Sequence, residues 1–548
     1  MTLLVSAEEM RAIEAEAVSR GVSWHELMER AGREAADLFI EHLGAASKQQ
    51  VLALAGPGNN GGDALVVARH LSECGWQVRC LTWARRDAGD AWLQGPLRER
   101  GVSVTHLTSQ TFDSELSTHL EWCSVVIDGL LGTGLQRDVE GDLAAIIGRV
   151  AASGNTVLAI DIPTGVDSDT GQVRGTALPA HFTAALGLLK YGHVLQPGKR
   201  LSGKIALGDI GLSTQASRTL ASGEQLNDSL VAAMLPERPE DANKGTFGKA
   251  MVVAGSINYI GAASLATEGA MRSGVGLVTL ACAGDLLRIV ATQLKECTFL
   301  PLPSDLGAIA APAAEKVKSA IEGYSALLVG CGLGNDKETA QFLRRLLQQQ
   351  EAPTRSPGRG IGFATRVLDN KSTDDEKKPS LPPLVLDADA LNILSEWEDW
   401  PSSVPEGSVL TPHPGEMARL MGSTVDDVRK DRVGVAKECA ARWKQVVVLK
   451  GAATVIAGPD GKVYVSPFSN PALATAGTGD VLAGAIAGLL AQGMTPTEAA
   501  CAGVYIHGMA GELLRQEYGV AGGLAGDLPV LMARSQRTLR ESVSANGK

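Results

Sequence analysis

The 548-residue sequence has few aromatic side chains and no excess of basic charge. Phe, Trp and Tyr make up 4% of the residues, and 50 basic residues face 61 acidic ones, which leaves a formal charge of −11. This balance excludes a general electrostatic attraction to nucleic acid, although a local basic groove stays possible. We therefore expect no nucleic-acid partner.

Closely spaced cysteines and long hydrophobic runs are also missing. The eight cysteines form no C-x-x-C motif, and a chain of this length does not need disulfide bonds, so we expect reduced structural thiols. The longest apolar run, residues 481–494, is too short to span a bilayer. The first 21 residues carry acidic side chains where a signal peptide would have a basic end and an apolar core. We expect a cytoplasmic protein without a membrane partner.

The sequence does contain two successive series of short apolar runs separated by helix-length stretches. The first series holds VLALAG, SVVIDGLLGTG and TVLAIDIPTGVD, and the second restarts at GKAMVVAGS. Apolar strands that alternate with helices predict parallel sheets buried on both faces, which is an α/β fold. The length of the chain also favours two or more domains.

The alternating pattern weakens between the two series, and we predict the domain boundary there. The predicted parts are an N-terminal domain over 1–215, a linker over 216–240 and a C-terminal domain over 241–540. Within the second domain, proline, glycine and mixed charges over about 353–381 predict a disordered surface insertion.

The stretch GPGNNGGD, residues 56–63, lies between the first apolar run and a helical pattern. A strand, a glycine-rich loop and a helix place backbone N–H groups at a helix N-terminus, where they can bind phosphate. The stretch is neither G-x-G-x-x-G nor a Walker A loop. Asn59, Asn60 and Asp63 add groups that could recognise hydroxyls or amides, or bind a cation. A tight turn with asparagine in the left-handed conformation is the alternative interpretation.

Two further strand ends carry polar side chains. Asp128 precedes a second glycine-bearing loop, and Asp161 and Thr164 follow the third apolar run. Because the carboxyl ends of the strands in an open α/β sheet face one crevice, the three loops are expected to be neighbours. Each aspartate could instead be only a helix cap.

Together, LMERAG, GPGNNGGDAL, DGLLGTG and DIPTG resemble the NAD(P)H-hydrate epimerase domain over about residues 1–215. The resemblance implies a Rossmann-like three-layer α/β/α domain and a potassium ion held by Asn60, Asp128 and Thr164. The implied contacts to the hydrated dinucleotide are Asn59, Asn60, Gly61, Gly62, Asp63, Gly132, Thr133, Gly134, Leu135, Gln136, Arg137, Asp138 and Asp161. Asp161 is our candidate for the group that handles the proton, and we treat this role as a hypothesis.

The stretch NPALATAGTGDVLAGAIAGLL, which begins at residue 470, is the sharpest motif of the chain. Gly477 and Gly479 flank Thr478 just before an apolar helix, and Asp480 lies where the helix dipole favours an ionised carboxyl group. Backbone donors beside a carboxylate base are what phosphoryl transfer to a hydroxyl requires. The alternative is a glycine-rich turn with a helix-capping aspartate.

This loop resembles the ribokinase-like signature A-G-[TD]-G-D. The stretches LTPHPGEMARL, KGTFGKA, GSINYIGAA, GCGLG and LDADALN narrow the resemblance to NAD(P)H-hydrate dehydratase over about residues 225–540, although Cys331 stands where that family usually has proline. A ribokinase-like α/β/α domain is implied. The implied hydrate contacts are Ala263, Gly334, His413 and Asp480, the last as the catalytic base. The implied contacts to ADP or ATP are Lys450, Gly451, Ala452, Ala453, Thr454 and Gly479.

The two resemblances imply one bifunctional enzyme that repairs hydrated NADH and NADPH. The N-terminal domain is expected to interconvert the R and S epimers with K⁺. The C-terminal domain is expected to dehydrate the S epimer with Mg²⁺ and ADP or ATP, releasing AMP or ADP and phosphate. We expect small-molecule partners and a homo-oligomer. The alternatives are a vitamin or sugar kinase with a dinucleotide-binding accessory domain, and a non-catalytic nucleotide sensor, against which the intact Asp480 argues.

Overall fold

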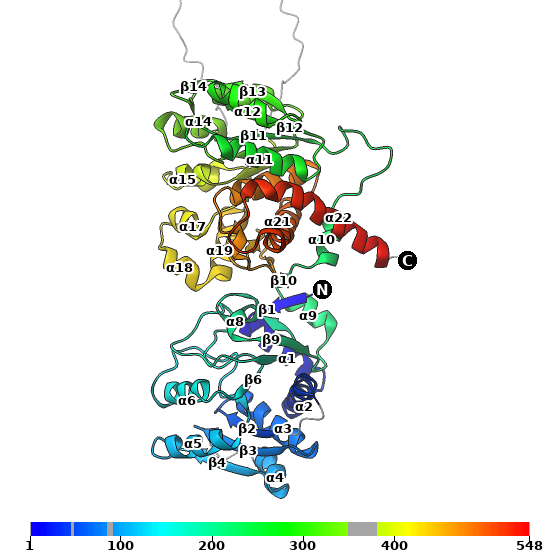
Figure 1. The fold of residues 1–548 in the computed structure, drawn as a ribbon, viewed down its shortest axis with the longest axis vertical. Coiled ribbons are helices and arrows are strands. Elements are labelled where there is room, and N and C mark those ends of the chain that lie inside the picture. Colours follow the sequence, from blue (N-terminus) through cyan, green and yellow to red (C-terminus); the bar gives the residue numbers. More distant parts are fainter. Residues whose placement is uncertain (1, 45–48, 85–90, 349–380, 547–548) are drawn as a thin grey trace, which may run out of the picture.

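The computed structural model describes residues 2–44, 49–84, 91–348 and 381–546. In Figure 1 the chain forms two lobes, the N-terminal lobe below and the C-terminal lobe above, which meet near β1 and β10. The predicted disordered insertion at about 353–381 lies outside the described residues, apart from residue 381.

A seven-stranded sheet, in which every neighbouring pair runs parallel, forms the centre of the N-terminal lobe. Its order is β4–β3–β2–β5–β6–β7–β9. The strands are β2 (Gln50–Ala55), β3 (Gln77–Trp83), β4 (Ser103–Leu107), β5 (Val125–Gly129), β6 (Thr156–Ile160), β7 (Phe182–Leu186) and β9 (Lys204–Gly208). The three apolar runs predicted as strands are β2, β5 and β6, which confirms that prediction.

Helices cover both faces of this sheet. Alternate residues of β2 enter different cores: Val51 and Ala53 pack with one set of helices, and Leu52 and Leu54 pack with the other. The helices of this lobe are α1 (Ala7–Ser19), α2 (Trp24–Leu43), α3 (Asn59–Glu73), α4 (Ala91–Glu99), α5 (Phe112–Trp122), α6 (Gly141–Ala152), α7 (Tyr191–Val194), α8 (Gly198–Leu201) and α9 (Thr214–Leu220). The predicted Rossmann-like three-layer arrangement is confirmed.

The C-terminal lobe repeats the alternation around the strand order β13–β12–β11–β16–β17–β18–β19, all parallel, followed by antiparallel β20 and β21. The strands are β11 (Lys249–Val253), β12 (Leu277–Ala283), β13 (Thr298–Leu302), β16 (Ala326–Val329), β17 (Leu384–Leu386), β18 (Val409–Leu410), β19 (Val446–Leu449), β20 (Val455–Ala457) and β21 (Val463–Val465), with a small hairpin of β14 (Ser304–Asp305) and β15 (Ala308–Ile309). The second predicted α/β domain is therefore confirmed.

The helices of the C-terminal lobe are α11 (Ile260–Arg272), α12 (Leu287–Gln293), α13 (Ala313–Ala320), α14 (Lys337–Leu347), α15 (Asp389–Leu394), α16 (Trp400–Ser403), α17 (Pro414–Met421), α18 (Val425–Lys430), α19 (Arg432–Trp443), α20 (Thr478–Ala491), α21 (Pro496–Tyr518) and α22 (Leu528–Asn546). The longest apolar run becomes α20, which is apolar on all sides because neighbouring elements bury it. A Cβ atom on Gly484 would lie 1.9 Å from the Ala266 carbonyl oxygen, so glycine lets α20 approach α11 closely.

One sheet continues from the C-terminal lobe into the N-terminal lobe. Strand β21 pairs in parallel with β10 (Gly223–Gln225), β10 pairs antiparallel with β1 (Thr2–Val5), and β1 pairs in parallel with β8 (Leu189–Lys190). The segment predicted as a linker thus contains β10, the end of α9 and the helix α10 (Asp228–Met234). The exact domain limits stay a prediction, but this segment forms part of the joint between the lobes.

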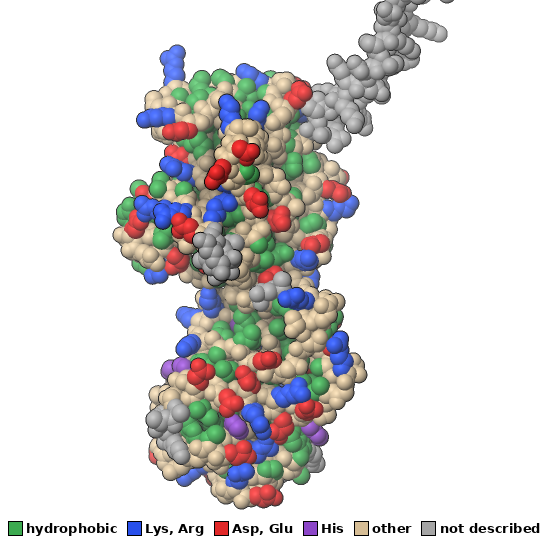
Figure 2. All heavy atoms as spheres, turned by 90° about the vertical axis from the view of Figure 1, so that its right-hand side faces the viewer, with side chains coloured by type: hydrophobic (Ala, Val, Ile, Leu, Met, Phe, Trp, Pro, Cys, Tyr) green, Lys and Arg blue, Asp and Glu red, His purple; other side chains and the backbone are tan. Residues whose placement is uncertain are grey.

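The surface carries charged side chains of both signs, interspersed on the face shown in Figure 2. All eight cysteines are free thiols. Within the described part of the chain, no helix combines the length and the apolar character needed to cross a membrane.

Candidate active sites

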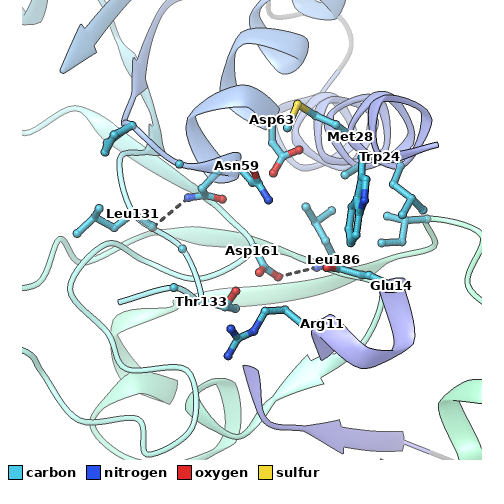
Figure 3. Close-up of a pocket in the computed structure, with 18 of the residues that line it drawn as sticks. Arg11, Glu14, Trp24, Met28, Asn59, Asp63, Leu131, Thr133, Asp161 and Leu186 are labelled. Carbon is cyan, nitrogen blue, oxygen red and sulfur yellow. Dashed lines mark hydrogen bonds between the residues drawn. The ribbon is translucent and has the colours of Figure 1, made fainter. Parts of the chain in front are cut away.

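A cavity of about 870 Å³ lies in the N-terminal lobe, between helices α1 and α2 and the loops that follow β2, β5 and β6 (Figure 3). The three loops predicted to be neighbours therefore meet. The predicted contacts that line the cavity are Asn59, Asn60, Asp63, Gly132, Thr133, Gly134, Leu135 and Asp161. Gln136 lines a smaller adjoining cavity of about 310 Å³.

Four residues predicted to contact the dinucleotide do not line either cavity: Gly61, Gly62, Arg137 and Asp138. Gly61 lies in the first turn of α3, where a Cβ atom would lie 2.0 Å from the carbonyl oxygen of Gly56. A Cβ atom on Gly56 would in turn lie 1.7 Å from the carbonyl oxygen of Leu130. Gly61 therefore allows the start of α3 to lie close to the end of β2, and Gly56 allows this segment to approach the loop after β5.

Asn60, Asp128 and Thr164, the predicted potassium ligands, lie around one point. The hydroxyl of Thr164 donates to Asp128 Oδ1 over 2.5 Å, and its backbone N–H donates to Asp128 Oδ2 over 2.8 Å. Asn60 Nδ2 donates a hydrogen bond of 3.0 Å to the carbonyl oxygen of Leu131. The backbone N–H of Leu131 in turn donates to Thr164 Oγ1 over 2.9 Å. The cluster offers one carboxylate and several neutral oxygens.

Asp128 is fully buried. Burial raises its pKa to about 6, and hydrogen bonds from Thr164 and Leu130 only partly oppose this effect. The set of carboxylate, carbonyl, hydroxyl and amide oxygens is one that hard cations prefer, and a cation would stabilise the ionised form of Asp128. These residues therefore fit K⁺.

Asp161 forms an ion pair at the edge of the cavity. Its Oδ1 atom lies 2.5 Å from Nζ of Lys190, a fully buried lysine, and accepts the Leu186 N–H over 3.1 Å. The backbone of Asp161 is left-handed, with φ of 61°. His193 Nε2 lies 2.6 Å from the Asp161 carbonyl oxygen, while His193 Nδ1 accepts the Lys190 N–H. These contacts hold Asp161 in a conformation that costs free energy for any residue but glycine.

The sequence prediction missed several residues that line the cavity: Arg11, Glu14, Trp24, His25, Met28, Trp92 and Lys190. Arg11 and Glu14 belong to α1, three residues apart and thus on one side of the helix. The apolar periodicity of α1 is visible in the sequence, but nothing in that pattern shows that its polar positions Arg11 and Glu14 line a cavity.

In the C-terminal lobe, Asp480 lies in the first turn of α20, just after Gly477, whose φ of 90° is left-handed. Burial raises the pKa of Asp480 to about 7, and the neighbouring carboxylate of Asp387 adds to the increase. A hydrogen bond with the Cys331 thiol and the charge of Lys450 lower the pKa of Asp480 and partly oppose this increase. The predicted base therefore changes charge near neutral pH, which suits a general base.

Asp387, at the end of β17, connects the elements around Asp480. Its Oδ1 atom accepts hydrogen bonds from Lys450 Nζ and from Thr411 Oγ1, each 2.7 Å long. Its Oδ2 atom accepts a hydrogen bond of 3.7 Å from the Cys331 thiol. Burial acts to lower the pKa of Lys450, but Asp387 and Glu416 outweigh it and raise that pKa. Lys450 therefore stays charged. It lies close to the start of α20, because a Cβ atom on Gly479 would lie 3.5 Å from Lys450 Nζ.

His413 caps α17, and its backbone N–H donates to Glu416 Oε2 over 2.7 Å. The same Glu416 oxygen lies 3.8 Å from Lys450 Nζ. His413 is therefore close to the ion pair of Lys450 and Asp387. Gly334 belongs to the same region, because its N–H donates over 2.8 Å to Asp389, a carboxylate that also raises the pKa of Asp480.

The remaining predicted residues take different positions. Ala263 is fully buried in α11. Gly451, Ala452, Ala453 and Thr454 lie in the turn between β19 and β20. This turn is held in place by Arg432, which donates to the Ala452 carbonyl oxygen over 2.6 Å. The structure thus brings His413, Gly334, Lys450, Gly479 and Asp480 together, with the nucleotide turn following Lys450.

Each lobe matches a known protein family. Residues 24–192 match the family described as YjeF-related protein N-terminus, and residues 250–354 and 358–531 match the family described as NAD(P)H-hydrate dehydratase. The chain is 34% identical to a bifunctional NAD(P)H-hydrate repair enzyme of Moorella thermoacetica, over 94% of this chain and 93% of that protein. The chain belongs to the bifunctional NAD(P)H-hydrate repair enzyme family. This result confirms the predicted family.

A second curated relative agrees with this assignment, and one solved structure is also similar to the chain. A bifunctional NAD(P)H-hydrate repair enzyme of Salinibacter ruber is 36% identical over 89% of this chain and 87% of that protein. A crystal structure of ADP/ATP-dependent NAD(P)H-hydrate dehydratase from Bacillus subtilis, co-crystallised with ATP and Mg²⁺, is 32% identical, with a TM-score of 0.45. That alignment covers 57% of this chain and 98% of the Bacillus protein.

Proposed function

We propose that this repair enzyme acts on hydrated NADH and NADPH at two separate sites. The N-terminal cavity epimerises the R and S hydrates, and the Asp480 site dehydrates the S hydrate at the expense of ADP or ATP. The observation that carries the proposal is the second site: a base with a pKa of about 7 at a helix N-terminus, beside the Lys450 ammonium.

Dehydration follows from the poor leaving ability of hydroxide. Asp480 accepts the proton of the ring hydroxyl while the hydroxyl oxygen attacks the terminal phosphorus of the nucleotide, and AMP or ADP leaves. The phosphate then departs from the ring carbon, and loss of a proton from the adjacent carbon restores the double bond. The N–H groups at the start of α20 and the charge of Lys450 stabilise the phosphate during transfer.

Mg²⁺ typically binds through one or two carboxylates and the phosphates of its nucleotide. Asp387, which follows β17, is a carboxylate that fits this requirement and leaves Asp480 to act as the base; an Oδ atom of each aspartate and Cys331 Sγ lie within 4.8 Å of one another. Burial and the two neighbouring aspartates raise the pKa of the Cys331 thiol well above its usual value. Because Mg²⁺ prefers oxygen ligands, the thiol is not expected to bind it. When bound, Mg²⁺ would neutralise phosphate charge.

In the N-terminal site, we propose that Asn60, Asp128 and Thr164 hold K⁺ and that Asp161 handles the proton in epimerisation. The oxygen cluster and the buried Lys190 support these roles. The roles of Gly61, Gly62, Arg137, Asp138, Ala263 and the turn after Lys450 stay predictions. The cytoplasmic location and the homo-oligomeric state also stay predictions.

The test is recovery of reduced-nicotinamide absorbance from a mixture of R and S hydrates of NADH, with Mg²⁺, K⁺ and either ADP or ATP. Recovery of the whole mixture, faster than spontaneous epimerisation allows, is the expected result. Recovery of the S fraction alone would refute the N-terminal activity. A folded protein that binds nucleotide but recovers neither epimer would refute the dehydratase activity and favour the kinase or sensor alternative.

A further inference from the structure

The N-terminal cavity contains a second carboxyl group besides Asp161, and it comes from a different part of the chain. Glu14 belongs to α1, whose first turn is fixed by a capping box in which Ser6 Oγ accepts the Glu9 N–H and Glu9 accepts the Ser6 N–H. Ile13 and Ala17 bury the apolar side of this helix. Glu14 therefore has a fixed direction, and Figure 3 shows it extending from α1 toward Asp161.

The two carboxyl groups have different electrostatic surroundings. Asp161 contacts Lys190 directly and accepts the backbone N–H of Leu186. Burial raises the pKa of Glu14, and Asp161 adds to this increase, while Lys190 and Arg11 act against it. A pair of carboxyl groups whose surroundings separate their protonation states is the usual arrangement of an acid and a base.

The chemistry of the substrate requires such a pair. Reduced nicotinamide is an enamine, and enamines add water so that the hydroxyl is on the carbon bonded to nitrogen. The stereocentre of the hydrate is therefore a hemiaminal carbon. Its configuration can be inverted by loss of the hydroxyl as water, followed by addition of water to the opposite face, with no oxidant or reductant.

On the basis of the proposed function, we infer that Glu14 is a catalytic residue of the epimerase site, acting as the general acid opposite the base Asp161. Glu14 donates its proton to the leaving hydroxyl oxygen as the C–O bond breaks, and the ring nitrogen lone pair forms a C=N⁺ bond. Water then adds to the other face of this carbon, and Asp161 takes a proton from it as the ring nitrogen regains its lone pair. Proton exchange with solvent resets the two carboxyl groups.

The test uses the full-length protein without nucleotide, so that only epimerisation is measured, starting from the pure R hydrate of NADH and following the S hydrate by chromatography. Glu14→Gln is expected to slow the reaction by about 10²-fold or more, since a positioned acid contributes about 10²–10⁴-fold. Glu14→Asp, which keeps the carboxyl group, is expected to recover part of the rate. Glu8→Gln, on the exposed side of the same helix, is the matched control and is expected to keep the wild-type rate.

The fused dehydratase provides an internal test of folding, because each variant is expected to dehydrate the pure S hydrate at the wild-type rate when nucleotide is added. A pH profile gives a second readout. The wild-type kcat/KM is expected to fall at high pH as Glu14, facing Lys190, Asp161 and Arg11, loses its proton, and Glu14→Gln is expected to lose this fall. In H₂¹⁸O, each inversion is expected to introduce one labelled oxygen.

The outcomes separate this inference from the proposed function. A wild-type protein that does not epimerise the R hydrate refutes the epimerase function itself. A wild-type protein that epimerises while Glu14→Gln does so at the same rate, or with an unchanged pH profile, refutes the role of Glu14. Epimerisation without ¹⁸O incorporation refutes the loss of water as the inverting step.

Discussion

The two lobes use similar charged groups in different surroundings. Each places a lysine against an aspartate at the carboxyl end of a parallel strand: Lys190 with Asp161 after β6, and Lys450 with Asp387 after β17. Each also places one more carboxyl group nearby, Glu14 in the first lobe and Asp480 in the second. The lysine stabilises one carboxylate, and burial raises the pKa of the other in both lobes.

The elements that supply the second carboxyl group differ. Asp480 lies at the start of a helix, where backbone N–H groups also face the site and suit a phosphate. Glu14 lies in the middle of α1 and lines the cavity. The oxygen atoms of Asn60, Asp128 and Thr164, which suit a cation, lie close to the same cavity, which Asn60 lines. Helix α3 also begins at the cavity of the first lobe, but its first turn contains no acidic residue, whereas that of α20 contains Asp480. The proposed phosphoryl transfer therefore depends on a carboxyl group at a helix N-terminus, which the first lobe does not have at α3.

The largest expected effect comes from removing the base of the second lobe. Asp480→Asn is expected to lower the kcat of dehydration by about 10²–10⁴-fold, because the hydroxyl loses its proton acceptor. The rate of dehydration is measured on the pure S hydrate with ADP or ATP. Epimerisation of the R hydrate, measured without nucleotide, is expected to be unchanged. A loss of both activities would show that the lobes are not independent.

The equivalent change in the first lobe is Asp161→Asn. Epimerisation is expected to fall by about 10²-fold, because the base is lost and the buried Lys190 loses its counter-ion. Chromatography of the R and S hydrates measures the rate, and dehydration of the S hydrate by the same sample checks that the protein is folded. Retained epimerisation would remove Asp161 from the mechanism.

The pH dependence of dehydration is expected to reveal the raised pKa of Asp480. The base acts in its ionised form, and its pKa is about 7, so kcat/KM is expected to rise through neutral pH and level off above it. At pH 6 the value is expected to be about tenfold below the plateau. Profiles of kcat/KM between pH 5.5 and 8.5 measure this, and a profile that is flat through neutrality would contradict the role of Asp480.

The smallest expected effect concerns the cation of the first lobe. K⁺ is expected to raise the melting temperature of the wild-type protein, because an ion that binds only the folded state adds about 2.7 kcal/mol of stability at a hundredfold excess over its Kd. Asp128→Asn is expected to abolish this increase, because the cluster loses its one carboxylate. Melting curves in KCl and in tetramethylammonium chloride at equal ionic strength measure it. An equal increase in both proteins would place the ion elsewhere.

Motifs on continuous stretches of sequence predicted much of both sites. Asp128 lies near the end of β5, and Asn60 and Thr164 follow β2 and β6. The apolar runs reveal these three strands, and the parallel sheet brings their ends to one edge. Asp480 likewise lies at the start of an apolar helix, and His413 lies between a strand and a helix. These parts of the sites could be predicted because local patterns determine the strands, and the fold class then determines where the strand ends meet.

The rest depends on packing between distant segments. Glu14 and Lys190 line one cavity, and the pairing of β1 with β8 brings their segments together. Strands of four and two residues are too short to show an alternating pattern. Gly61 shows a second kind of ambiguity: its motif predicts contact with a ligand, and its missing side chain also allows a close backbone approach. The sequence pattern alone does not distinguish these two reasons for a glycine.

The sheet shared by the lobes has a consequence for any attempt to express them separately. A cut between the lobes on the C-terminal side of β10 would separate that strand from β21 and leave each fragment with an unpaired strand edge. Exposed edges of this kind pair readily with other chains. The fragments are therefore expected to aggregate when made alone and to reassemble through the β10–β21 edge when made together, which would turn the joint into a test for two-part complementation.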